Sequence, residues 1–507
     1  MLRFLTAGES HGPSLTVIVE GLPAGLPISV EQIGDQLARR RLGYGRGPRM
    51  RFERDEIRIT AGVRHGRTLG SPVSIEILNT EWPKWEVEMS IAPGTPTTKL
   101  TAPRPGHADL VGMQKYGFDD ARDVLERASA RETTARVAAG ALAKALLAEL
   151  GIDIVSHVVR IGAIASASED RPGPNDLDRI DESEVRCNNP EVEAAMITEI
   201  KAAAKEGDSL GGVAEVIAYG VPAGLGSHVH WDRKMDGLLA GALMSIQAVK
   251  AVEIGDGMAQ STQRGSVAHD AIAVDASAHS SGGFMRRTDH AGGLEGGMTS
   301  GAPLIARVSM KPLASLNRPV LETVDVATGE STVSFKERTD VTAVPALGVI
   351  AEAMTALASV GPAVASALQI NFVDLDVAIS NQVGSPASDI IREQGVTTFR
   401  SFELAVLRTL LEEDIVIATG GGVVVTEACR DLLKREPMVV WLDAEVDVLI
   451  SRVQAGDRPL LVGDLADRLG QLRSERSSWY REVATKQIDA NGSLDEVVEH
   501  VLDCVRT

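Results

Sequence analysis

Cysteine is almost absent from this sequence, and its scarcity is informative. Cys187, Cys429 and Cys504 are the three cysteines among 507 residues, and their spacing matches no metal-ligand motif. An odd, scattered set is typical of a reducing compartment without a disulfide framework, so we expect a cytoplasmic protein and no metal site. The chain reaches Glu9 and His11 before any apolar run, so we also expect no signal peptide.

Positive charge and long hydrophobic runs are scarce as well. The chain has 51 Lys and Arg against 70 Asp and Glu, a formal net charge of −19. Nucleic-acid affinity depends on clustered Lys and Arg, so we expect no nucleic-acid partner, while anionic small molecules need only a local positive site. The longest apolar stretch, roughly residues 349–368, is interrupted by Glu352, Gly361 and Pro362. It argues against a membrane span and favours a buried helix followed by a break.

What the chain does contain divides it into two parts of different texture. Hydrophobic residues make up 44% and charged residues 24%, as in globular proteins, and 507 residues suffice for more than one domain. The first part is rich in glycine and arginine, with short strand-like runs and Ala-rich amphipathic helices. We expect strands at 15–19 and 56–60 and helices at 133–150 and 233–251.

The second part alternates short apolar strands with helices. We expect strands at 415–418 and 438–442 and helices at 403–411 and 446–454. This alternation predicts a parallel α/β sheet with crossover helices. The predicted division is a first domain at 1–357, a junction at 358–370 and a second domain at 371–507.

Seven arginines fall within sixteen residues of an otherwise acidic chain. They are Arg39, Arg40, Arg41, Arg46, Arg49, Arg51 and Arg54. The planar guanidinium binds phosphate and carboxylate through paired hydrogen bonds, so the cluster has the composition of a local anion receptor. A solvated charged face is the alternative interpretation. The interleaved Gly43, Gly45 and Gly47 favour a loop that wraps a ligand.

Two histidines lie in glycine-bearing loops, His11 in residues 8–12 and His107 in residues 104–107. Histidine is the commonest general acid–base group, although a lone loop histidine is more often ordinary surface chemistry. A dense glycine run at 292–301 would let backbone N–H groups approach a phosphate or a flat cofactor closely. It could equally be a flexible loop, and no clear dinucleotide fingerprint supports a Rossmann fold.

Four segments in order carry a resemblance to a known family. Residues 8–12, 127–133, 292–301 and 338–340 are similar to the signature segments of chorismate synthase and span nearly all of residues 1–356. The resemblance implies an α+β fold, a β-α-β sandwich of two sheets with helices between them, and a homotetramer. It also implies a 1,4-elimination of phosphate from 5-enolpyruvylshikimate 3-phosphate, assisted by reduced FMN, with NADPH as a candidate reductant.

The resemblance further implies roles for individual residues. His107 would protonate the departing phosphate, His11 would protonate or hold the reduced flavin, and Asp340 would help to remove the C6 proton. Arg40 and Arg46 match positions that contact an anionic ligand or NADPH. The residues expected against the flavin are Arg127, Ala128, Ser129, Gln247, Ala248, Gly296, Lys311, Pro312, Leu313, Ala314, Ser315 and Arg338.

Two positions depart from the family pattern. The glycine-rich segment opens with Asp289 and His290, where the family usually has Asn-Ala-Gly-Gly or a close variant, and Thr339 replaces the histidine of an Arg-His-Asp triplet. Neither change removes one of the three proposed catalytic groups. An acid at Asp289 could alter the affinity for reduced FMN, which is itself anionic.

The second part resembles shikimate kinase from that family's second strand to its end. The residues that the resemblance places against shikimate are Asp376, Arg400, Gly421 and Arg476. Asp374 would lie near magnesium and Arg458 in a lid over ATP. Carboxylates at a strand end and a Gly-rich turn after a parallel strand suit such ligands, although strand-to-helix turns also need glycine for structural reasons.

The phosphate-binding element of that family is missing. Its kinases begin with a strand and a loop of the form Gly-x-x-x-x-Gly-Lys-Ser/Thr, whose backbone and lysine hold the phosphates of ATP. Residues 359–368 do not fit this pattern. We therefore expect a truncated parallel α/β, P-loop-kinase-like domain without its central strand and without kinase activity. Two alternatives stay open: a bifunctional enzyme that also phosphorylates shikimate, and a shikimate-binding regulatory or assembly module.

Overall fold

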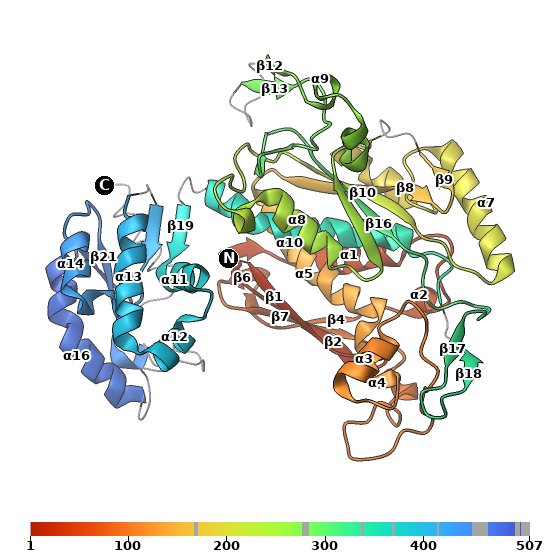
Figure 1. Ribbon diagram of the computed structural model, residues 1–507, viewed down its shortest axis with the longest axis horizontal. Coiled ribbons are helices and arrows are strands. Elements are labelled where there is room, and N and C mark those ends of the chain that lie inside the picture. The colour runs from red at the N-terminus through yellow and green to blue at the C-terminus, as the bar shows by residue number, and fades with distance from the viewer. Residues whose placement is uncertain are drawn as a thin grey trace. The chain divides into compact units, whose positions relative to one another are not determined.

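The computed structural model describes residues 2–166, 171–275, 283–335, 339–367, 371–412, 415–448, 465–491 and 497. The chain forms two compact units, Met1–Val364 and Ala365–Thr507, coloured from red to blue along the sequence in Figure 1. Each unit has a hydrophobic core of its own. Such separate cores are the usual mark of domains that bury apolar surface independently.

The first unit contains a four-stranded antiparallel sheet in the order β1-β2-β7-β4. Its strands are β1 (Arg3–Ala7), β2 (Ser14–Glu20), β4 (Ile57–Ala61) and β7 (Val73–Leu78). Side chains alternate along each strand, so one face is apolar: Val73, Ile75 and Ile77 are buried, whereas Ser74 and Glu76 are partly exposed. The strands predicted at 15–19 and 56–60 are confirmed.

A second antiparallel sheet of five strands has the order β11-β16-β10-β8-β9. Its strands are β8 (Asp153–Ile161), β9 (Ile164–Ala165), β10 (Gly212–Tyr219), β11 (Val249–Ile254) and β16 (Leu304–Met310). Val158, Val216 and Val308 on its central strands belong to the same buried cluster as the apolar face of the smaller sheet. The two sheets therefore share one core.

Three helices lie between the two sheets: α1 (Val30–Arg41), α5 (Thr133–Glu149) and α10 (Val344–Ala367). Their apolar side chains belong to the shared core, and Figure 1 shows them in the middle of the first unit. Helices α5 and α10 pack so closely that a Cβ on Gly140 would lie 2.5 Å from Ala353 Cα. The predicted sandwich of two sheets with helices between them is confirmed, as is the helix predicted at 133–150.

The remaining elements of the first unit form its loops and smaller hairpins. The helices among them are α2 (Arg49–Phe52), α3 (Asp109–Tyr116), α4 (Arg122–Ala128), α6 (Leu177–Glu182), α7 (Pro190–Glu206), α8 (Met235–Met244) and α9 (Gly265–Ala268). The short 3-10 helices are η1 (Trp82–Lys84), η2 (Ala130–Glu132), η3 (Pro174–Asp176), η4 (Trp231–Arg233) and η5 (Gly257–Thr262). The strands are β3 (Ala24–Pro27), β5 (Val63–Arg64), β6 (Arg67–Leu69), β12 (Ile272–Val274), β13 (Phe284–Arg286), β14 (Leu294–Glu295), β15 (Met298–Thr299), β17 (Glu322–Val324) and β18 (Ser331–Val333).

The structure corrects two predictions about helices. Residues 233–251 form helix α8 followed by the start of strand β11, not one helix, because the alternating β11 sequence gains more from pairing with β16. The break expected near Gly361 and Pro362 is also wrong, since α10 continues to Ala367. A proline removes one helical hydrogen bond, but Val360 and Ala363 on either side of it are buried in the core of the first unit, and this packing favours continuation of the helix.

The second unit contains two pairs of parallel strands. Strand β19 (Asn371–Asp374) pairs with β20 (Ile415–Ala418), and β21 (Val440–Asp443) pairs with β22 (Lys486–Asp489). In the part of the chain that the structure describes, no backbone hydrogen bond joins one pair to the other. The parallel α/β arrangement is confirmed, and its sheet is divided in two.

Helices connect and cover these strands. They are α11 (Leu375–Val383), α12 (Ala387–Gln394), α13 (Val396–Leu410), α14 (Glu427–Leu433) and α16 (Leu465–Val483), with the 3-10 helix η7 (Val423–Val425) after β20. The helix predicted at 403–411 forms most of α13. The helix predicted at 446–454 lies mostly outside the described residues.

The long apolar stretch at 349–368 supplies most of α10. Glu352 within it is buried among cationic side chains. No helix in the described ranges is long and apolar enough to cross a lipid bilayer. Those ranges also contain no group of three or more His, Cys, Asp or Glu side chains placed to hold a metal ion.

Candidate active site

His11 lies in the loop between β1 and β2. Its Nδ1 contacts both carboxylate oxygens of Glu126, at 2.9 and 3.0 Å, and its backbone N–H donates to Glu126 Oε2 at 2.9 Å. Trp85 stacks on the imidazole with 4.0 Å between ring centroids. Burial alone would raise the pKa of Glu126, but the hydrogen bond and charge of His11 outweigh burial and lower it.

His107 lies in the loop that leads into α3. Its Nδ1 is 2.5 Å from Asp109 Oδ1, and Arg104 donates to the same carboxylate through Nε at 2.8 Å and Nη2 at 3.1 Å. Burial would raise the pKa of Asp109, but hydrogen bonds from His107 and Arg104 hold it below its usual range. Lys311 Nζ donates to the carbonyl of Gly106 and ties this loop to the end of β16. Both histidines therefore have a buried carboxylate on Nδ1.

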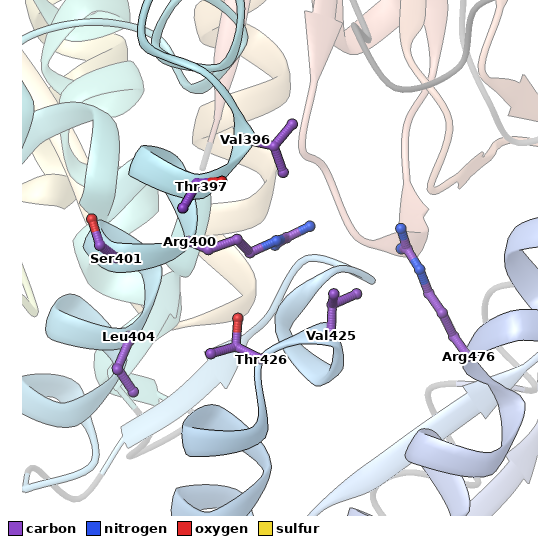
Figure 2. Close-up of a pocket in the computed structure, with 8 residues that line it drawn as sticks. All are labelled: Val396, Thr397, Arg400, Ser401, Leu404, Val425, Thr426 and Arg476. Atoms are coloured by element: carbon purple, nitrogen blue, oxygen red, sulfur yellow. The ribbon is translucent and has the colours of Figure 1, made fainter.

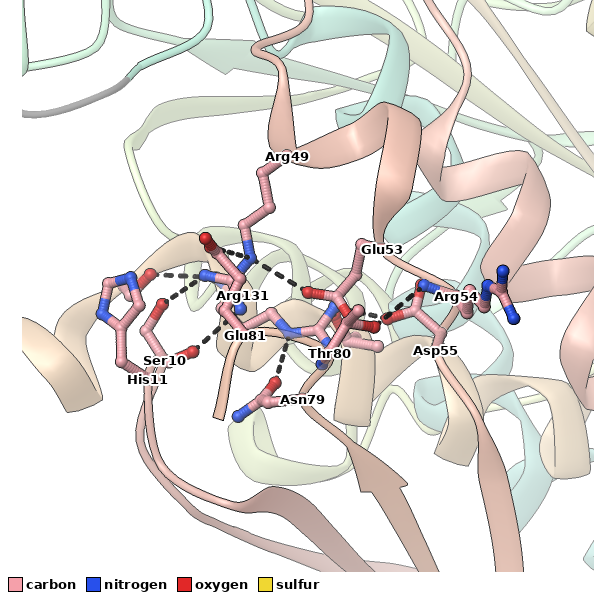
Figure 3. Close-up of polar contacts among 12 residues, drawn as sticks. Ser10, His11, Arg49, Glu53, Arg54, Asp55, Asn79, Thr80, Glu81 and Arg131 are labelled. Carbon is pink, nitrogen blue, oxygen red and sulfur yellow. Dashed lines mark hydrogen bonds and ion pairs between the residues drawn. The ribbon is translucent and has the colours of Figure 1, made fainter. Parts of the chain in front are cut away.

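The arginine-rich segment contacts a group of buried carboxylates, which Figure 3 shows together with His11. Arg49 lies 3.0 Å from Glu53 and also donates to the hydroxyl and carbonyl of Ser10 at 3.1 and 2.9 Å. Arg131 forms an ion pair with Asp55 in the same group. Arg49 thus connects the cluster to the loop that carries His11.

Most of the positive charge in this cluster is neutralised inside the protein. The ion pairs are Arg39–Glu352 (2.7 Å), Arg41–Asp55 (3.5 Å), Arg46–Asp340 (2.9 Å) and Arg49–Glu53 (3.0 Å). Several partners come from distant segments, so the spacing of the arginines alone could not reveal them. The cluster is largely an internal ion-pair network instead of a fully open receptor.

Among the described residues, Arg40 has a buried nitrogen with neither a hydrogen-bond nor an ion-pair partner, whereas the buried Nε atoms of Arg41 and Arg46 form ion pairs with Asp55 and Asp340. The Nε of Arg40 donates to Thr133 Oγ1 at 2.9 Å and its Nη2 to the Ala130 carbonyl at 3.0 Å. Its Nη1 is buried and has no hydrogen-bond partner among the described residues. Burial lowers the pKa of Arg40 to about 9. A buried donor of this kind is costly unless a bound group satisfies it.

The first residues expected at the flavin are linked through Glu132. Arg127, at the end of α4, donates to the carbonyl and hydroxyl of Thr6 at 2.8 and 2.7 Å. The Thr6 hydroxyl donates to Glu132 Oε1 at 2.7 Å, and Gln247 Nε2 donates to Glu132 Oε2 at 2.7 Å. Ser129 caps η2 by accepting the Arg131 N–H. The side-chain oxygen of Gln247 is buried without a hydrogen-bond partner in the described part of the chain.

The 311–315 segment joins this region to the loop of His107. Ala248 adopts a φ of +65°, which is rare for a residue other than glycine, and its carbonyl accepts the Lys311 N–H at 3.0 Å. Arg104 Nη1 donates to Ser315 Oγ at 2.7 Å. Leu313 accepts a hydrogen bond from Ser209 at 2.8 Å through its carbonyl. Segments far apart in the sequence are therefore linked between the two histidines.

Asp340 belongs to the same network through the arginine-rich segment. Its Oδ2 lies 2.9 Å from Arg46 Nε, and its Oδ1 accepts the Gly47 N–H at 2.5 Å. Gly296 lies apart, in the turn between β14 and β15, and no hydrogen bond among the described residues links it to this network. Arg338 lies outside the described residues.

Several members of the network were not predicted from the sequence, among them Glu126, Asp109, Glu132 and Trp85. One usable signal was the spacing of Arg122 and Glu126, which are four residues apart on α4 and form an ion pair at 3.1 Å. A second was that Asp109 follows His107 by two residues in a loop. Nothing in the sequence indicates that Trp85 would lie over His11, because the contact joins a long loop to a distant turn.

The second unit contains a cavity of about 530 Å³, shown in Figure 2. Arg400 on α13 and Arg476 on α16 line it, together with apolar and hydroxyl side chains such as Val425 and Thr426. Arg400 Nη1 lies 2.7 Å from both oxygens of Glu403, while its Nε is buried without a hydrogen-bond partner among the described residues. The cavity therefore has an incompletely satisfied cation in its wall.

The other residues predicted to contact shikimate lie near these arginines. Arg476 Nη1 donates to the carbonyl of Gly421 at 2.8 Å. Asp376 is the second residue of α11 and lies beside the glycine turn, where a Cβ on Gly420 would be 3.2 Å from its carboxylate. The side chain of Asp374 and all of Arg458 lie outside the described residues.

Comparisons with known proteins identify both parts. Residues 2–361 match the chorismate synthase family and residues 358–506 the shikimate kinase family. The chorismate synthases of Salinispora tropica and Thermobifida fusca are 59% and 57% identical over 366 and 369 residues, in each case 70% of this chain and 92% of the relative. A crystal structure of chorismate synthase is similar at 40% identity with a TM-score of 0.57, covering 72% of this chain and 92% of that one. The chain belongs to the chorismate synthase family, lyases of the shikimate pathway that need reduced flavin, and carries a C-terminal shikimate-kinase-like domain.

Proposed function

We propose that the first unit eliminates phosphate from 5-enolpyruvylshikimate 3-phosphate to form chorismate, with reduced FMN bound beside the substrate. The observation that supports this proposal is a series of hydrogen bonds and chain neighbours that links the loops of the two histidines. His11 bonds Glu126, and the next residue, Arg127, donates to Thr6. Thr6 and Gln247 both donate to Glu132. Ala248, which follows Gln247, accepts from Lys311, whose Nζ donates to Gly106 in the His107 loop. Acid–base groups linked in this way can act on two parts of one ligand.

The charge of the site suits the substrate. The substrate carries a phosphate and two carboxylates, and burying these without cationic partners would be costly. Arg40 has a buried donor without a partner among the described residues, and the side chain of Arg127 is 43% exposed. Of the two arginines expected to contact an anionic ligand or NADPH, Arg40 is ready to do so, whereas Arg46 would first have to leave Asp340.

The residues present also fit a flavin. The oxygen of Gln247 and Nη1 of Arg40 are buried polar atoms that lack partners in the described part of the chain, as expected where a polar ligand completes the site. We propose that these residues, Arg127–Ser129 and the 311–315 segment hold FMN. Reduced FMN, when bound, supplies electronic assistance to the elimination and is regenerated in each turnover.

The elimination breaks the C–O bond to phosphate and a C–H bond at C6, and the ring gains a second double bond. We assign the proton for the departing phosphate to His107 and removal of the C6 proton to Asp340. Protonation of a leaving group by a positioned histidine accelerates a reaction by about 10²–10⁴-fold. His11 would protonate or hold the reduced flavin.

The test is chorismate formation under anaerobic conditions with chemically reduced FMN. We expect turnover with reduced FMN and none with oxidised FMN. A second reaction with oxidised FMN and NADPH asks whether the protein reduces its own flavin. Absence of chorismate with reduced FMN present would contradict the proposal. Light scattering on the same sample tests the homotetramer that we propose from the family resemblance.

For the second unit we propose binding of shikimate without phosphate transfer. The partly unsatisfied Arg400, with Arg476 in the same cavity, suits the carboxylate of a small acid. The phosphate loop that would hold ATP has no counterpart in the sequence before Asp374. Incubation with ATP, Mg²⁺ and shikimate should give no shikimate 3-phosphate, and product formation at an ordinary kinase rate would make the chain bifunctional instead. Calorimetric titration with shikimate tests the binding itself.

A further inference from the structure

We propose that Asp109 and Glu126 are positioning residues that keep a proton on Nδ1 of His107 and His11, so that Nε2 is the nitrogen that exchanges the reacting proton; His107 then donates to the phosphate from Nε2 as the imidazolium and keeps its Nδ1 proton. This inference rests on the roles proposed above for the two histidines. It adds which atom of each ring acts and which residues decide it.

The contacts of His107 determine its tautomer. Nδ1 is 2.5 Å from Asp109 Oδ1 and 3.1 Å from Arg104 Nη2, and it cannot donate to the first while accepting from the second. Asp109 is buried between two cationic or donating groups, and its pKa is lowered, so it is a carboxylate that only accepts. The proton must therefore lie on Nδ1, and the contact with Arg104 is a consequence of Arg104 binding Asp109.

The contacts of His11 lead to the same result. Both oxygens of Glu126 face Nδ1, and the pKa of this buried carboxylate is lowered as well. The charged groups around this ring are Glu126, Arg122, which bonds Glu126 at 3.1 Å, and Arg49, which reaches the loop through Ser10. Of these, Glu126 alone contacts the imidazole. Nδ1 carries the proton and Nε2 is left for the ligand.

Each carboxylate is in turn fixed by an arginine that packs on an aromatic ring. Arg104 holds Asp109 and lies 5.0 Å from the Phe335 ring centroid. Arg122 holds Glu126 and lies 5.0 Å from the ring of Trp85, whose plane stacks on His11. Aromatic residues make up only 3% of the chain, yet one of them contacts the arginine at each histidine. The same four-part arrangement of imidazole, carboxylate, arginine and aromatic ring thus occurs at both histidines.

A third histidine shows that the residue types alone do not make such a site. His157 contacts Glu215, which is also held by Arg171 and Arg307, but the bonded nitrogen is Nε2. The His157 side chain is 1% exposed, whereas His11 and His107 are 12% and 21% exposed. His290 also contacts a carboxylate through Nδ1, Asp256 at 2.6 Å, and is 27% exposed, but no arginine ion pair fixes Asp256 among the described residues. The buried His157 group is therefore a matched structural control.

The experiment compares Asp109→Asn and Glu126→Gln with Glu215→Gln in the full chain. Solid-state ¹⁵N spectra of histidine-labelled protein report which ring nitrogen carries the proton, without requiring turnover. Signals are assigned from His11→Gln and His107→Gln. We expect Nδ1–H for both histidines in the wild-type protein. We expect a loss of that preference in the matching variant, and no change at either ring in Glu215→Gln.

The pH dependence of anaerobic chorismate formation is the second readout. An imidazolium that loses a neighbouring carboxylate is less stabilised, so the alkaline limb of the kcat profile in Asp109→Asn should move to lower pH. We expect kcat to fall about 10–100-fold, as for partners of other catalytic or metal-bound histidines, with a smaller change in KM. Glu215→Gln should lose thermal stability but keep the position of the limb.

Three results would overturn the proposal. The first is an Nε2–H tautomer at His107 or His11 in the wild-type spectra, which needs no variant to fold. The second is an unmoved pH limb in Asp109→Asn with kcat reduced only in proportion to lost stability. The third is an equal shift in Glu215→Gln. A wild-type protein that makes no chorismate would contradict the proposed function, while the tautomer spectra would still test this inference.

Discussion

In the first unit, the buried carboxylate of Glu352 is paired with cations from several distant segments, whereas the buried Glu403 of the second unit is paired locally. Glu352 on α10 contacts Arg39 on α1, Lys144 on α5 and Arg186. In the second unit, Glu403 pairs with Arg400, three residues away on the same helix, and the parallel strands of the described residues form two separate pairs. Both units keep buried donors without a hydrogen-bond partner in the described part of the chain, such as Nη1 of Arg40 and Nε of Arg400, so the contrast lies in how far apart the paired charges are in the sequence.

This difference indicates where function depends on the fold. A buried ion pair gains little net stability over apolar packing, but loss of one member is costly because it leaves a charge alone. The first unit therefore has a fold that tolerates few changes around α10 and the arginine-rich segment. The second unit contains a cavity lined by two arginines, and its described strands form two separate pairs instead of one sheet. The predictions below test this contrast in order of decreasing effect.

The largest effect is expected at the chemistry of the first unit. His107→Ala removes the proton donor for the phosphate, so kcat should fall about 10²–10⁴-fold. Asp340→Asn should have an effect of similar size because an amide cannot take the C6 proton. Initial rates of chorismate formation with reduced FMN measure both.

Flavin binding provides the control for these two variants. We expect each to bind FMN close to the wild-type affinity in a fluorescence titration, because neither change removes the proposed cofactor contacts. Arg400→Ala in the second unit should leave the rate unchanged. Near-normal turnover in both His107→Ala and Asp340→Asn would show that the roles are assigned to the wrong residues.

The next largest effect is expected from Glu352→Gln in the core of the first unit. This change leaves Arg39, Lys144 and Arg186 without their shared anion, and breaking a buried pair costs about 3–5 kcal/mol. Burial would raise the pKa of Glu352, but the charges of Arg39 and Lys144 outweigh it and lower that pKa. Denaturant unfolding of the first unit measures the loss.

The sign of the accompanying pH effect follows from that pKa. Because it is lower in the folded state, the charge of Glu352 stabilises the fold fully above the unfolded value of about 4.3. The contribution is lost as pH falls from there toward the folded pKa. The wild-type protein should thus lose stability in acid more steeply than Glu352→Gln, and parallel curves would contradict the assignment.

Smaller effects on stability, of opposite sign, are expected when two helical glycines are replaced by alanine. A Cβ on Gly140 in α5 would lie 2.5 Å from Ala353 Cα, so Gly140→Ala should destabilise the first unit by about 1–3 kcal/mol. A Cβ on Gly470 in α16 would meet nothing within 4 Å, so Gly470→Ala should stabilise the second unit by about 0.5–1 kcal/mol. If thermal melts show that the two substitutions change the melting temperature in the same direction, the two helices do not differ in packing as described.

The strand pattern and the protein family could be predicted from the sequence, but the partners of the charged residues could not. Alternation along β2 and β4 and the apolar run of α5 are local properties, so they could be recognised without a structure. The ion pairs of Arg39 and Arg46 connect residues about 300 positions apart, for which one sequence carries no signal. The same holds for Trp85 over His11.

The two incorrect predictions have local causes. In residues 233–251, alanine and leucine suit a helix, and the alternating pattern that made β11 a strand occupies only the last few residues. At Gly361 and Pro362 the two strongest helix breakers occur together, yet α10 continues through both. Helix propensity alone predicted neither outcome correctly, because tertiary packing decided both.

The smallest effect is expected from removing the second unit, if the cut is placed correctly. Val360 and Ala363 on α10 are both 2% exposed and belong to the core of the first unit. A chain of residues 1–367 keeps them and should form chorismate at the wild-type rate.

A chain of residues 1–357, which ends at the boundary predicted from the sequence, loses Val360 and Ala363. Burial of one valine side chain is worth about 1.5–3 kcal/mol, so this chain should melt earlier by a measurable margin. Equal stability of the two chains would place the boundary of the first domain at 357, whereas loss of activity in residues 1–367 would mean that the second unit supports the synthase after all.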